Sequence, residues 1–239
     1  MDGVLLIWAI AAAALLVLAG ILGRQTGVGA GFLGILVDGR GRYSLNHLQV
    51  VLWTIVILSL VAGIFFGRLI EGADDPLGFT IPSEVLGLLG ISLGSSLVAG
   101  ATKSSKDQTA GERIAASNAE DKPRLAQIFL ADEGQFADKV IDIAKFQNFV
   151  ITLILVITYA ALAIDEIVEA KTATEIGLPT FSPTFLTLLG ISHAAYVAGK
   201  IPSQAGTPPG LTVENRMNVE PNQLPDGVTA RNPGVESRG

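Results

Sequence analysis

The apolar residues of this chain lie in long blocks between polar segments, and not at the regular spacing of soluble strands or helices. Three blocks carry no charged residue: Val4–Gly23, Leu48–Gly67 and Phe146–Ile164. An uncharged stretch of about 18 or more residues is long enough to cross a ~30 Å hydrocarbon core as a helix. Each block therefore predicts a transmembrane helix.

Two further blocks, Val85–Thr102 and Phe185–Gly199, are rich in Gly, Ala and Ser, and the second is short. They follow Pro82 and Pro183. Proline fits the first turn of a helix because its missing N–H breaks no bond there. Helices that begin at these prolines and end at the next polar segment would be about 28–33 Å long at 1.5 Å per residue. We therefore expect five spans.

The basic residues follow the same five-span pattern. Fourteen of the 16 Lys and Arg residues fall in the first loop, the third loop and the C-terminal segment, and only Arg68 and Lys171 fall elsewhere. Cytoplasmic loops carry the Lys/Arg excess of membrane proteins, so the N-terminus should be outside and the C-terminus in the cytoplasm. The only charged residue before Val4–Gly23 is Asp2, so this block lacks the basic region of a signal peptide. We interpret it as a retained helix rather than a signal peptide.

The predicted outer side is acidic, with nine Asp and Glu residues against two basic ones. The candidate outer acidic patch comprises Glu71, Asp74, Asp75, Asp165, Glu166 and Glu169. Such a patch could form a vestibule that concentrates cations. The simpler interpretation, which we favour, is that the topology rule excludes Lys and Arg from outer loops and tolerates acids there.

A unit of about one hundred residues occurs twice, which indicates a repeated structural unit. The matching pairs are LLGIS at 88–92 and 188–192, VAG at 98–100 and 197–199, Gln49 and Thr54 with Gln147 and Thr152, and ILVDG at 35–39 with FLADEG at 129–134. Each unit would cross the membrane twice, so both copies have the same orientation. We expect a parallel repeat about a pseudo-twofold axis along the membrane normal.

A Gln at the entry to one span, followed by LLGIS with Tyr196 and Lys200 after it, resembles the paired hairpins of a group of bacterial multi-pass membrane proteins. The resemblance covers about Ile35–Ile201 without the linker between the copies. It implies a helical membrane protein of bacterial origin and carries no activity. The first copy departs from the pattern, because Ser96 stands where the second has Tyr196.

The chain thus predicts an all-α integral membrane protein whose five transmembrane helices are arranged as 1 + 2 + 2. The expected parts are a leading helix (1–24), a first hairpin (25–103, with spans 48–67 and 82–103), a polar linker (104–122), an amphipathic segment with the second hairpin (123–201, with spans 146–164 and 183–201), and a disordered cytoplasmic tail (202–239). The tail is rich in proline and has no apolar run, so it cannot bury a core.

Pro123–Lys145 carries apolar residues at helical spacing, from Leu125 to Ile143. One interpretation is an amphipathic helix that lies on the inner membrane surface or docks a partner. The other is a helical extension of the fourth span. The pattern does not decide between them.

Gly90–Gly94 matches G-x-S-x-G, the nucleophile elbow of hydrolases, which needs a strand–turn–helix context with acid and His partners. Here the motif lies in an apolar span. Small residues four positions apart instead let membrane helices approach closely. We therefore expect helix packing at Gly90, Ser92, Gly94, Gly190, Ser192, Ala194 and Ala198.

Gly29–Gly34 matches G-x-G-x-x-G but follows a membrane helix without room for a βαβ unit, so we interpret it as a flexible loop. After it, Asp38 and Gly39 predict a turn near the lipid headgroups. Arg40 and Arg42 follow the turn, and we expect them to face lipid phosphate.

His193 is expected about 15 Å along its helix from Pro183, near mid-membrane. Ionisable residues at that depth are functional candidates. It could be a proton-sensitive gate or an ion-path ligand, or a neutral side chain that hydrogen-bonds between helices; a single histidine without a carboxylate partner favours the last. The candidate intramembrane polar site comprises His193, Thr152, Tyr159, Gln49 and Gln147.

Composition narrows the function. The chain has no cysteine, which excludes disulfides, thiolate nucleophiles and cysteine metal sites. Only 16% of its residues are charged, against about 25% in soluble domains. No acid–base pair, metal cluster or nucleophile constellation emerges. We therefore expect no enzyme activity, no metal or cofactor, and no nucleic-acid partner.

The expected function is a non-enzymatic scaffold or anchor in the bacterial inner membrane. It would pack with itself or with partner membrane proteins, and dock cytosolic proteins through residues 123–145 or 202–239. The alternative is an oligomeric cation channel or small transporter with an acidic outer vestibule. That alternative needs several subunits, because two hairpins and one helix are few to enclose a pore.

Overall fold

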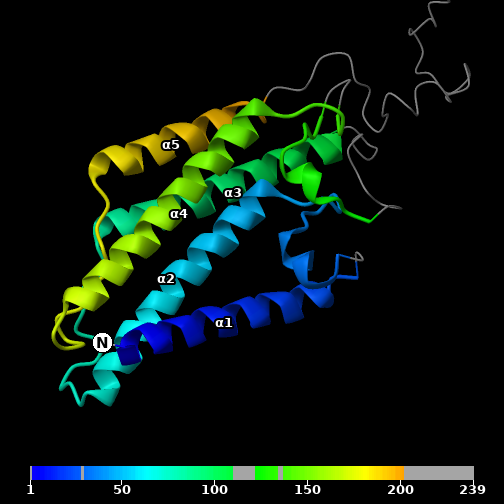
Figure 1. The fold of residues 1–239 in the computed structure, drawn as a ribbon. Helices are drawn as coiled ribbons and strands as arrows, with labels where there is room; N and C mark the ends of the chain where they lie inside the picture. The colour runs from blue at the N-terminus through cyan, green and yellow to red at the C-terminus, as the bar shows by residue number, and fades with distance from the viewer. Residues whose placement is uncertain (1, 28–29, 110–121, 134–136, 202–239) are drawn as a thin grey trace, which may run out of the picture.

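The computed structural model describes residues 2–27, 30–109, 122–133 and 137–201. The described chain is helical, with elements α1 (Asp2–Arg24), η1 (Gly31–Leu36), α2 (Leu45–Ile70), α3 (Ser83–Thr109), η2 (Leu125–Ile128), α4 (Ile143–Glu169) and α5 (Pro183–Ala198). In the bundle, α2 packs against both α1 and α4 (Figure 1). The predicted tail, 202–239, and most of the predicted linker lie outside the described residues.

Four helices are long and apolar enough to cross a membrane: α1, α2, α3 and α4. This confirms a helical protein with several membrane-compatible helices. The fifth expected span forms the 16-residue α5, which is about 24 Å long at 1.5 Å per residue and shorter than a ~30 Å hydrocarbon core. By contrast, α3 continues to Thr109, so the first residues of the expected linker are helical.

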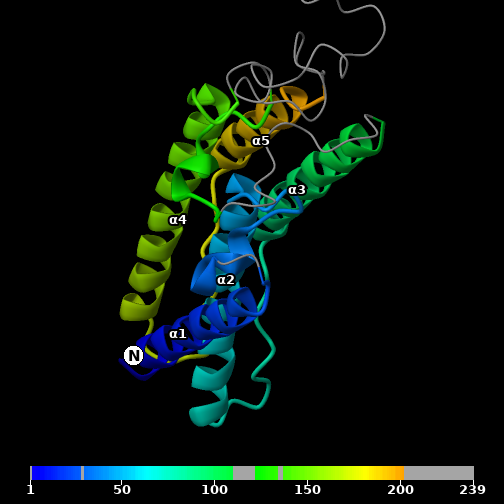
Figure 2. The ribbon, with the colours of Figure 1, turned by 90° about the vertical axis from the view of Figure 1, so that its right-hand side faces the viewer.

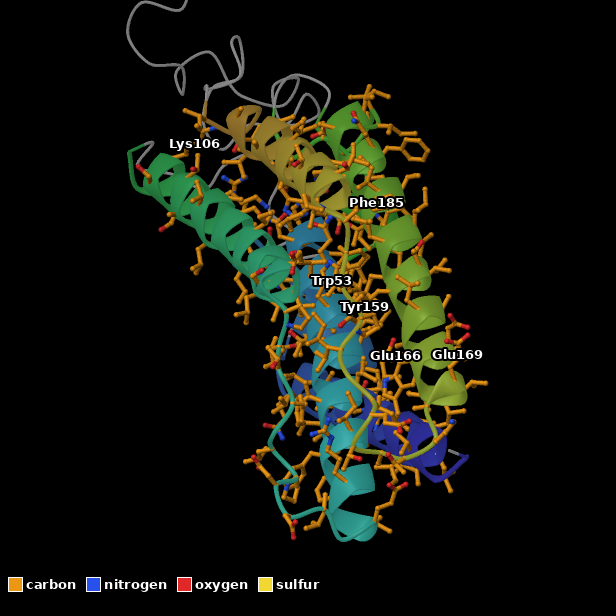
Figure 3. All side chains as sticks on the ribbon, turned by 90° about the vertical axis from the view of Figure 1, so that its left-hand side faces the viewer. Trp53, Lys106, Tyr159, Glu166, Glu169 and Phe185 are labelled. Atoms are coloured by element: carbon orange, nitrogen blue, oxygen red, sulfur yellow. The ribbon has the colours of Figure 1, made fainter. Side chains whose placement is uncertain are left out.

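The helices α3 and α5 begin part-way along the bundle. Non-helical residues 71–82 and 170–182 run back beside α2 and α4 before these helices start (Figure 3). The helix α5 then packs against both α3 and α4 (Figure 2). We call the end where α2 and α4 begin the basic end, and the opposite end the acidic end.

Three aromatic side chains fill the core between α2, α4 and the segment before α5. The ring centroid of Trp53 lies 6.2 Å from those of Tyr159 and Phe181, and the last two centroids are 5.1 Å apart. Trp53 and Tyr159 are fully buried. Each such pair contributes about 0.5–1.5 kcal/mol beyond its buried area. Because Phe181 lies two residues before the start of α5, this cluster holds the segment that leads into α5.

A close approach of two long helices involves two glycines of α2 that face α1. A Cβ added at Gly63 would lie 3.0 Å from Trp8 Cβ, and one added at Gly67 would lie 2.7 Å from Val4 Cγ2. Nearby, Trp8 Nε1 donates a hydrogen bond to Ser59 Oγ at 2.9 Å. Gly63 and Gly67 are four residues apart, the small-xxx-small spacing of close membrane helices. The sequence pattern predicts such packing in α3 and α5 and does not single out α2.

The segment before α4 is not the helix expected over Pro123–Lys145. It forms the short η2, then an isolated β-bridge between Leu130 and Ile141, and α4 begins only at Ile143. The apolar residues of this segment therefore do not share one helical face. Leu125 and Ile141 are exposed, and Ile128 is buried against the start of α2.

Candidate functional site: a buried ion-pair cluster

Asp132 lies at the centre of a buried group of charges at the basic end. Lys145 Nζ lies 2.6 Å from its Oδ1, and Lys200 Nζ is bonded to its Oδ2. Lys103 Nζ lies 3.4 Å from Oδ2, and Arg42 Nη2 lies 3.6 Å from Oδ1. These basic side chains come from α4, the residues after α5, α3 and the loop before α2. One carboxylate therefore joins four parts of the fold.

Three further carboxylates extend the group. Asp38 Oδ2 lies 2.7 Å from Lys103 Nζ, and Asp138 Oδ2 lies 2.6 Å from Arg42 Nη1. Glu133 pairs through its two oxygens with the basic groups of Arg40 and Lys106. The ion-pair cluster, as we use the term, comprises Asp38, Arg40, Arg42, Lys103, Lys106, Asp132, Glu133, Asp138, Lys145 and Lys200.

The loop before α4 holds Asp132 in place through its backbone. Leu130 and Ile141 form the isolated antiparallel bridge. Asp142 then caps α4, and its carboxylate accepts two backbone N–H bonds from the first turn at 3.0 and 3.3 Å. An Asp N-cap satisfies amide groups that otherwise have no partner at the start of a helix. The bridge and the cap together place Asp132 beside Lys145 of the first turn.

The loop before α2 has a similar layout, with a bridge between Val37 and Tyr43. The Asp38 carboxylate accepts backbone N–H bonds from Arg40 and Arg42 at 3.0 and 3.2 Å. The two arginines are only 7% and 1% exposed. Our expectation that they face lipid phosphate is thus not met. They turn inward because carboxylates of the loop before α4 lie within reach, and a buried charge needs an opposite partner.

The cluster keeps the carboxylates of Asp132 and Asp38 ionised. Burial by itself raises the pKa of the Asp132 carboxyl, but the four surrounding basic side chains outweigh burial and hold this pKa well below its usual range. Burial also opposes the shift at Asp38, where Lys103 and two backbone N–H bonds lower the pKa. Removing one partner of such a buried pair typically costs about 3–5 kcal/mol, because the remaining charge stays buried.

A layer of uncharged polar side chains lies next to the cluster. Gln49 Nε2 donates to Asn148 Oδ1 at 3.0 Å and to Thr152 Oγ1 at 2.7 Å. Ser192 Oγ donates to the same Asn148 oxygen at 3.3 Å. The layer therefore joins α2, α4 and α5 and includes two predicted polar residues, Gln49 and Thr152. A third, Gln147, is exposed on α4 and takes no part in it.

His193 links α5 to α3. Its Nδ1 lies 2.6 Å from Ser95 Oγ, whereas Thr152 bonds to Gln49 and Tyr159 belongs to the aromatic core. His193 also lies nearer to the basic end than the expected mid-membrane position, since the adjacent Ser192 bonds to the second turn of α4. The reason is that residues 170–182 run along the bundle before α5 begins.

The predicted packing residues divide between inward and outward positions. Ser92 and Ser192 are buried, and a Cβ added at Gly190 would lie 3.7 Å from Ile91 Cδ1. A Cβ added at Gly90 or Gly94 would meet no atom of the structure within 4 Å. Ala194 and Ala198 are exposed. The close contact between α3 and α5 instead lies at Gly87, where an added Cβ would be 3.0 Å from Leu186 Cδ2.

At the acidic end, one member of the predicted acidic patch is bonded within the fold and the others are exposed. Glu71 Oε2 accepts a hydrogen bond from the Ala173 backbone N–H at 2.6 Å. Beside it, buried Arg68 donates to the carbonyl oxygens of Ala173, Thr174 and Ile176. These bonds tie the end of α2 to the loop after α4. Glu166 and Glu169 point away from the bundle (Figure 3). All remaining members of the patch are exposed: Asp74, Asp75, Asp165, Glu166 and Glu169.

Sequence reasoning missed the cluster as a unit, although one signal was present. Asp38 and Asp132 occupy matching positions in the two copies, each before a span and each in a basic loop. Paired acids among many cations indicate internal ion pairs. No group of three or more His, Asp and Glu side chains among the described residues could hold a metal ion. Comparison with protein-family models, curated proteins and solved structures finds no match for this chain.

Proposed function

We propose that this protein is a non-enzymatic membrane scaffold or anchor of the bacterial inner membrane. Its N-terminus is outside and its basic end is cytoplasmic. The chain crosses five times, with α5 as the fifth crossing. Helical-type hydrogen bonds continue past α5 to the Ile201 N–H, so the segment from Pro183 is about 28 Å long at 1.5 Å per residue.

The hairpins α2–α3 and α4–α5 are proposed to form a parallel repeat. Each of α2 and α4 follows a 3₁₀ helix and an isolated β-bridge. Each of α3 and α5 follows a non-helical return segment and has a proline at its start, Pro82 just before α3 and Pro183 as the first residue of α5. These shared features support the repeat independently of the LLGIS identity.

The observation that carries the scaffold proposal is the bonded interior of the bundle. The ion-pair cluster closes the basic end, the Gln49–Asn148 layer lies next to it, and the aromatic core around Trp53 fills the middle. An ion path needs polar groups that water can reach along the axis, whereas here Gln49, Asn148 and Thr152 are buried and bond across α2 and α4. Some buried polar atoms, such as Gln49 Oε1 and Asn148 Nδ2, have no partner among the described residues. A rigid, internally bonded bundle suits a protein that holds partners in place.

The outer surface of the bundle suits packing with other membrane helices. Large apolar side chains are exposed on several helices, such as Leu6, Ile10, Ile157 and Ile191. Beside them, Gly90 and Gly94 of α3 and Ala194 and Ala198 of α5 present small residues outward. In lipid, small residues favour helix association because backbones can approach closely. We propose that these faces contact a second copy or a partner membrane protein.

Cytosolic partners are proposed to dock at the basic end. The chain continues from Thr109 and from Ile201 into 110–121 and 202–239, and both departure points follow cluster residues, Lys106 and Lys200. The cluster would therefore hold the start of the candidate docking segment 202–239 beside the other candidate, 123–145, which carries Asp132 and Lys145.

An affinity purification in mild detergent tests this function. The full chain should recover a specific partner, and a chain that ends at Ile201 should lose it. A control chain with residues 202–239 replaced by a Gly/Ser linker of equal length separates recognition from length. The complex should then form again from the purified components. Equal recovery by all three chains, or no partner with any, would contradict docking through the tail.

The channel hypothesis has a separate test. Ion flux in liposomes that contain the purified protein should be absent over a range of pH and voltage. Flux that His193→Ala changes would refute the scaffold proposal and favour an oligomeric channel.

A further inference from the structure

Two hollows adjoin on the surface of the first hairpin. One is an apolar groove of about 470 Å³ between α1, α2 and α3, lined by residues such as Leu15, Leu22, Ile55 and Leu97. The other is a polar pocket of about 430 Å³ at the basic end. His47 and Ser96 line both hollows, so the two meet along these side chains.

The pair of hollows has the shape of a site for an amphipathic molecule. The apolar groove follows membrane-compatible helices, and its α2 wall from His47 to Ile55 is about 12 Å long at 1.5 Å per residue. The polar pocket lies at the basic end, where the headgroups of one leaflet would be. A water-soluble ligand would leave the groove unused, and a plain hydrocarbon would leave the pocket unused.

The charges of the polar pocket fit a phosphate group. Arg40 and Lys103 line it together with one carboxylate, Asp38. Lys103 bonds to Asp38, and Arg40 bonds to Glu133, so a phosphate would join existing ion pairs as a further acceptor. Charge-assisted hydrogen bonds from Arg and Lys to phosphate are about twice as strong as neutral ones.

A second polar group in the pocket, the amide oxygen of Asn46, could accept a hydrogen bond from the ligand. Asn46 is only 6% exposed and lines the pocket. Its amide oxygen has no hydrogen-bond partner in the part of the chain that the structure describes. A buried acceptor without a partner is costly, by about 1–3 kcal/mol. A headgroup hydroxyl or ammonium would satisfy it, as glycerol or ethanolamine could.

The matching place in the second hairpin holds larger side chains. In the register of the LLGIS segments, Tyr196 stands where the first hairpin has Ser96. In the register of Gln49 and Gln147, Lys145 stands where the first has His47. Both larger side chains are buried, and Lys145 bonds to Asp132. The open groove is thus a consequence of small side chains in one hairpin.

From these observations we propose that the groove binds one glycerophospholipid. An acyl chain lies along α1, α2 and α3, the phosphate lies at Arg40 and Lys103, and the headgroup donor reaches Asn46. This inference goes beyond the scaffold role and does not depend on it.

Native mass spectrometry of the detergent-purified full chain tests the site with three probes: phosphatidylglycerol, diacylglycerol and inorganic phosphate. One phosphatidylglycerol should remain bound. Diacylglycerol, which lacks the phosphate, should bind at least about tenfold more weakly, because a charge-assisted hydrogen bond is worth about 1.5–3 kcal/mol. Inorganic phosphate should give no adduct. Equal retention of diacylglycerol, or binding of phosphate alone, would overturn the proposal.

Variants locate the binding in the groove. Ser96→Tyr fills the junction of the two hollows and should reduce lipid retention at least about fivefold, which is about 1 kcal/mol. Leu86→Tyr adds the same ring on α3 at a position that is 54% exposed and outside the groove, and it should retain the lipid. Should Ser96→Tyr fail to fold, Asn46→Asp decides, since a carboxylate there repels the phosphate at almost unchanged volume.

Three results would overturn the assignment to this groove. The first is wild-type retention in both Ser96→Tyr and Asn46→Asp. The second is equal loss in Leu86→Tyr. The third is a lipid adduct that appears only when the chain ends at Ile201, which would show that residues of the tail occupy the groove.

Discussion

In the proposed repeat, aligned positions of the two hairpins hold different side chains. In the second, Lys145, Tyr196 and Lys200 gather around Asp132 and fill the basic end. In the first, His47 and Ser96 line the open groove, and Asp38 forms its ion pair with Lys103. The second hairpin therefore supplies the central carboxylate of the cluster, and the first supplies the open surface.

The first hairpin also makes room for α1. Gly63 and Gly67 of α2 lie against Val4 and Trp8. In the register of the Gln residues, Ala161 and Asp165 stand at these places in α4, and both are exposed. The leading helix therefore packs on one hairpin because only that hairpin offers glycines at the contact.

The largest expected effect distinguishes the two aspartates. Asp132→Asn should lower the free energy of unfolding by about 3–5 kcal/mol, because it leaves several buried cations without their shared carboxylate. Asp38→Asn should lower the free energy of unfolding by less, since Lys103 still has the Asp132 carboxylate as a partner at 3.4 Å. Thermal unfolding of the purified protein in detergent measures both. Equal losses would show that Asp132 is not the central carboxylate of the cluster.

Acid should remove the difference between wild type and Asp132→Asn. The folded-state pKa of Asp132 lies well below its usual range, so its stabilisation is present above the unfolded pKa of about 3.9 and is lost as pH falls through the folded value. The gap in unfolding temperature should therefore stay constant from about pH 7 to 5 and shrink below about pH 4. A gap that widens in acid would contradict the role of the carboxylate.

A smaller effect should separate the two outer helix faces. Gly63→Leu should destabilise the protein by about 1–3 kcal/mol, because the added side chain overpacks against Trp8. Ala161→Leu, the matched change on α4, should have little effect because that position is exposed. The yield of a chemical cross-link between α1 and α2 should fall only in the Gly63→Leu variant. Similar behaviour of both variants would refute selective packing of α1.

The smallest expected effect concerns the contact between the hairpins. Ser95→Ala removes the partner of His193 Nδ1 and should cost about 1 kcal/mol. The second hairpin already has alanine at the matching position, Ala195, so Ala195→Ser serves as a control that adds a hydroxyl without removing a bond. Unfolding temperatures would compare the two. No loss in Ser95→Ala would mean that His193 finds another partner.

The sequence predicted the helices well because block hydrophobicity is a local property. The three strongest blocks lie within α1, α2 and α4. It failed over Pro123–Lys145, where the bridge of Leu130 with Ile141 replaced a helix. Periodicity there could not reveal that Asp132 must stay in a loop to reach lysines from three other segments.

The candidate site was predictable only in part. Gln49 and Thr152 were expected in one intramembrane polar site with His193, and they bond to each other rather than to His193. Their depth follows from their place in long helices. His193 was misplaced along the bundle, since the length of the return segment before α5 is not visible in a hydropathy pattern. Arg40 and Arg42 were placed outward, because their partners lie about ninety residues away, a pairing that only tertiary structure brings together.

Single-cysteine labelling tests the central claim, an anchor that crosses five times with its basic end in the cytoplasm. The chain has no cysteine of its own, so Asp74→Cys, Thr172→Cys, Ser104→Cys and Ser203→Cys each report one loop or terminus. A membrane-impermeant maleimide should label Asp74→Cys and Thr172→Cys in intact cells, and Ser104→Cys and Ser203→Cys only after permeabilisation. Labelling of Ser203→Cys in intact cells would show that α5 does not cross and would contradict the account.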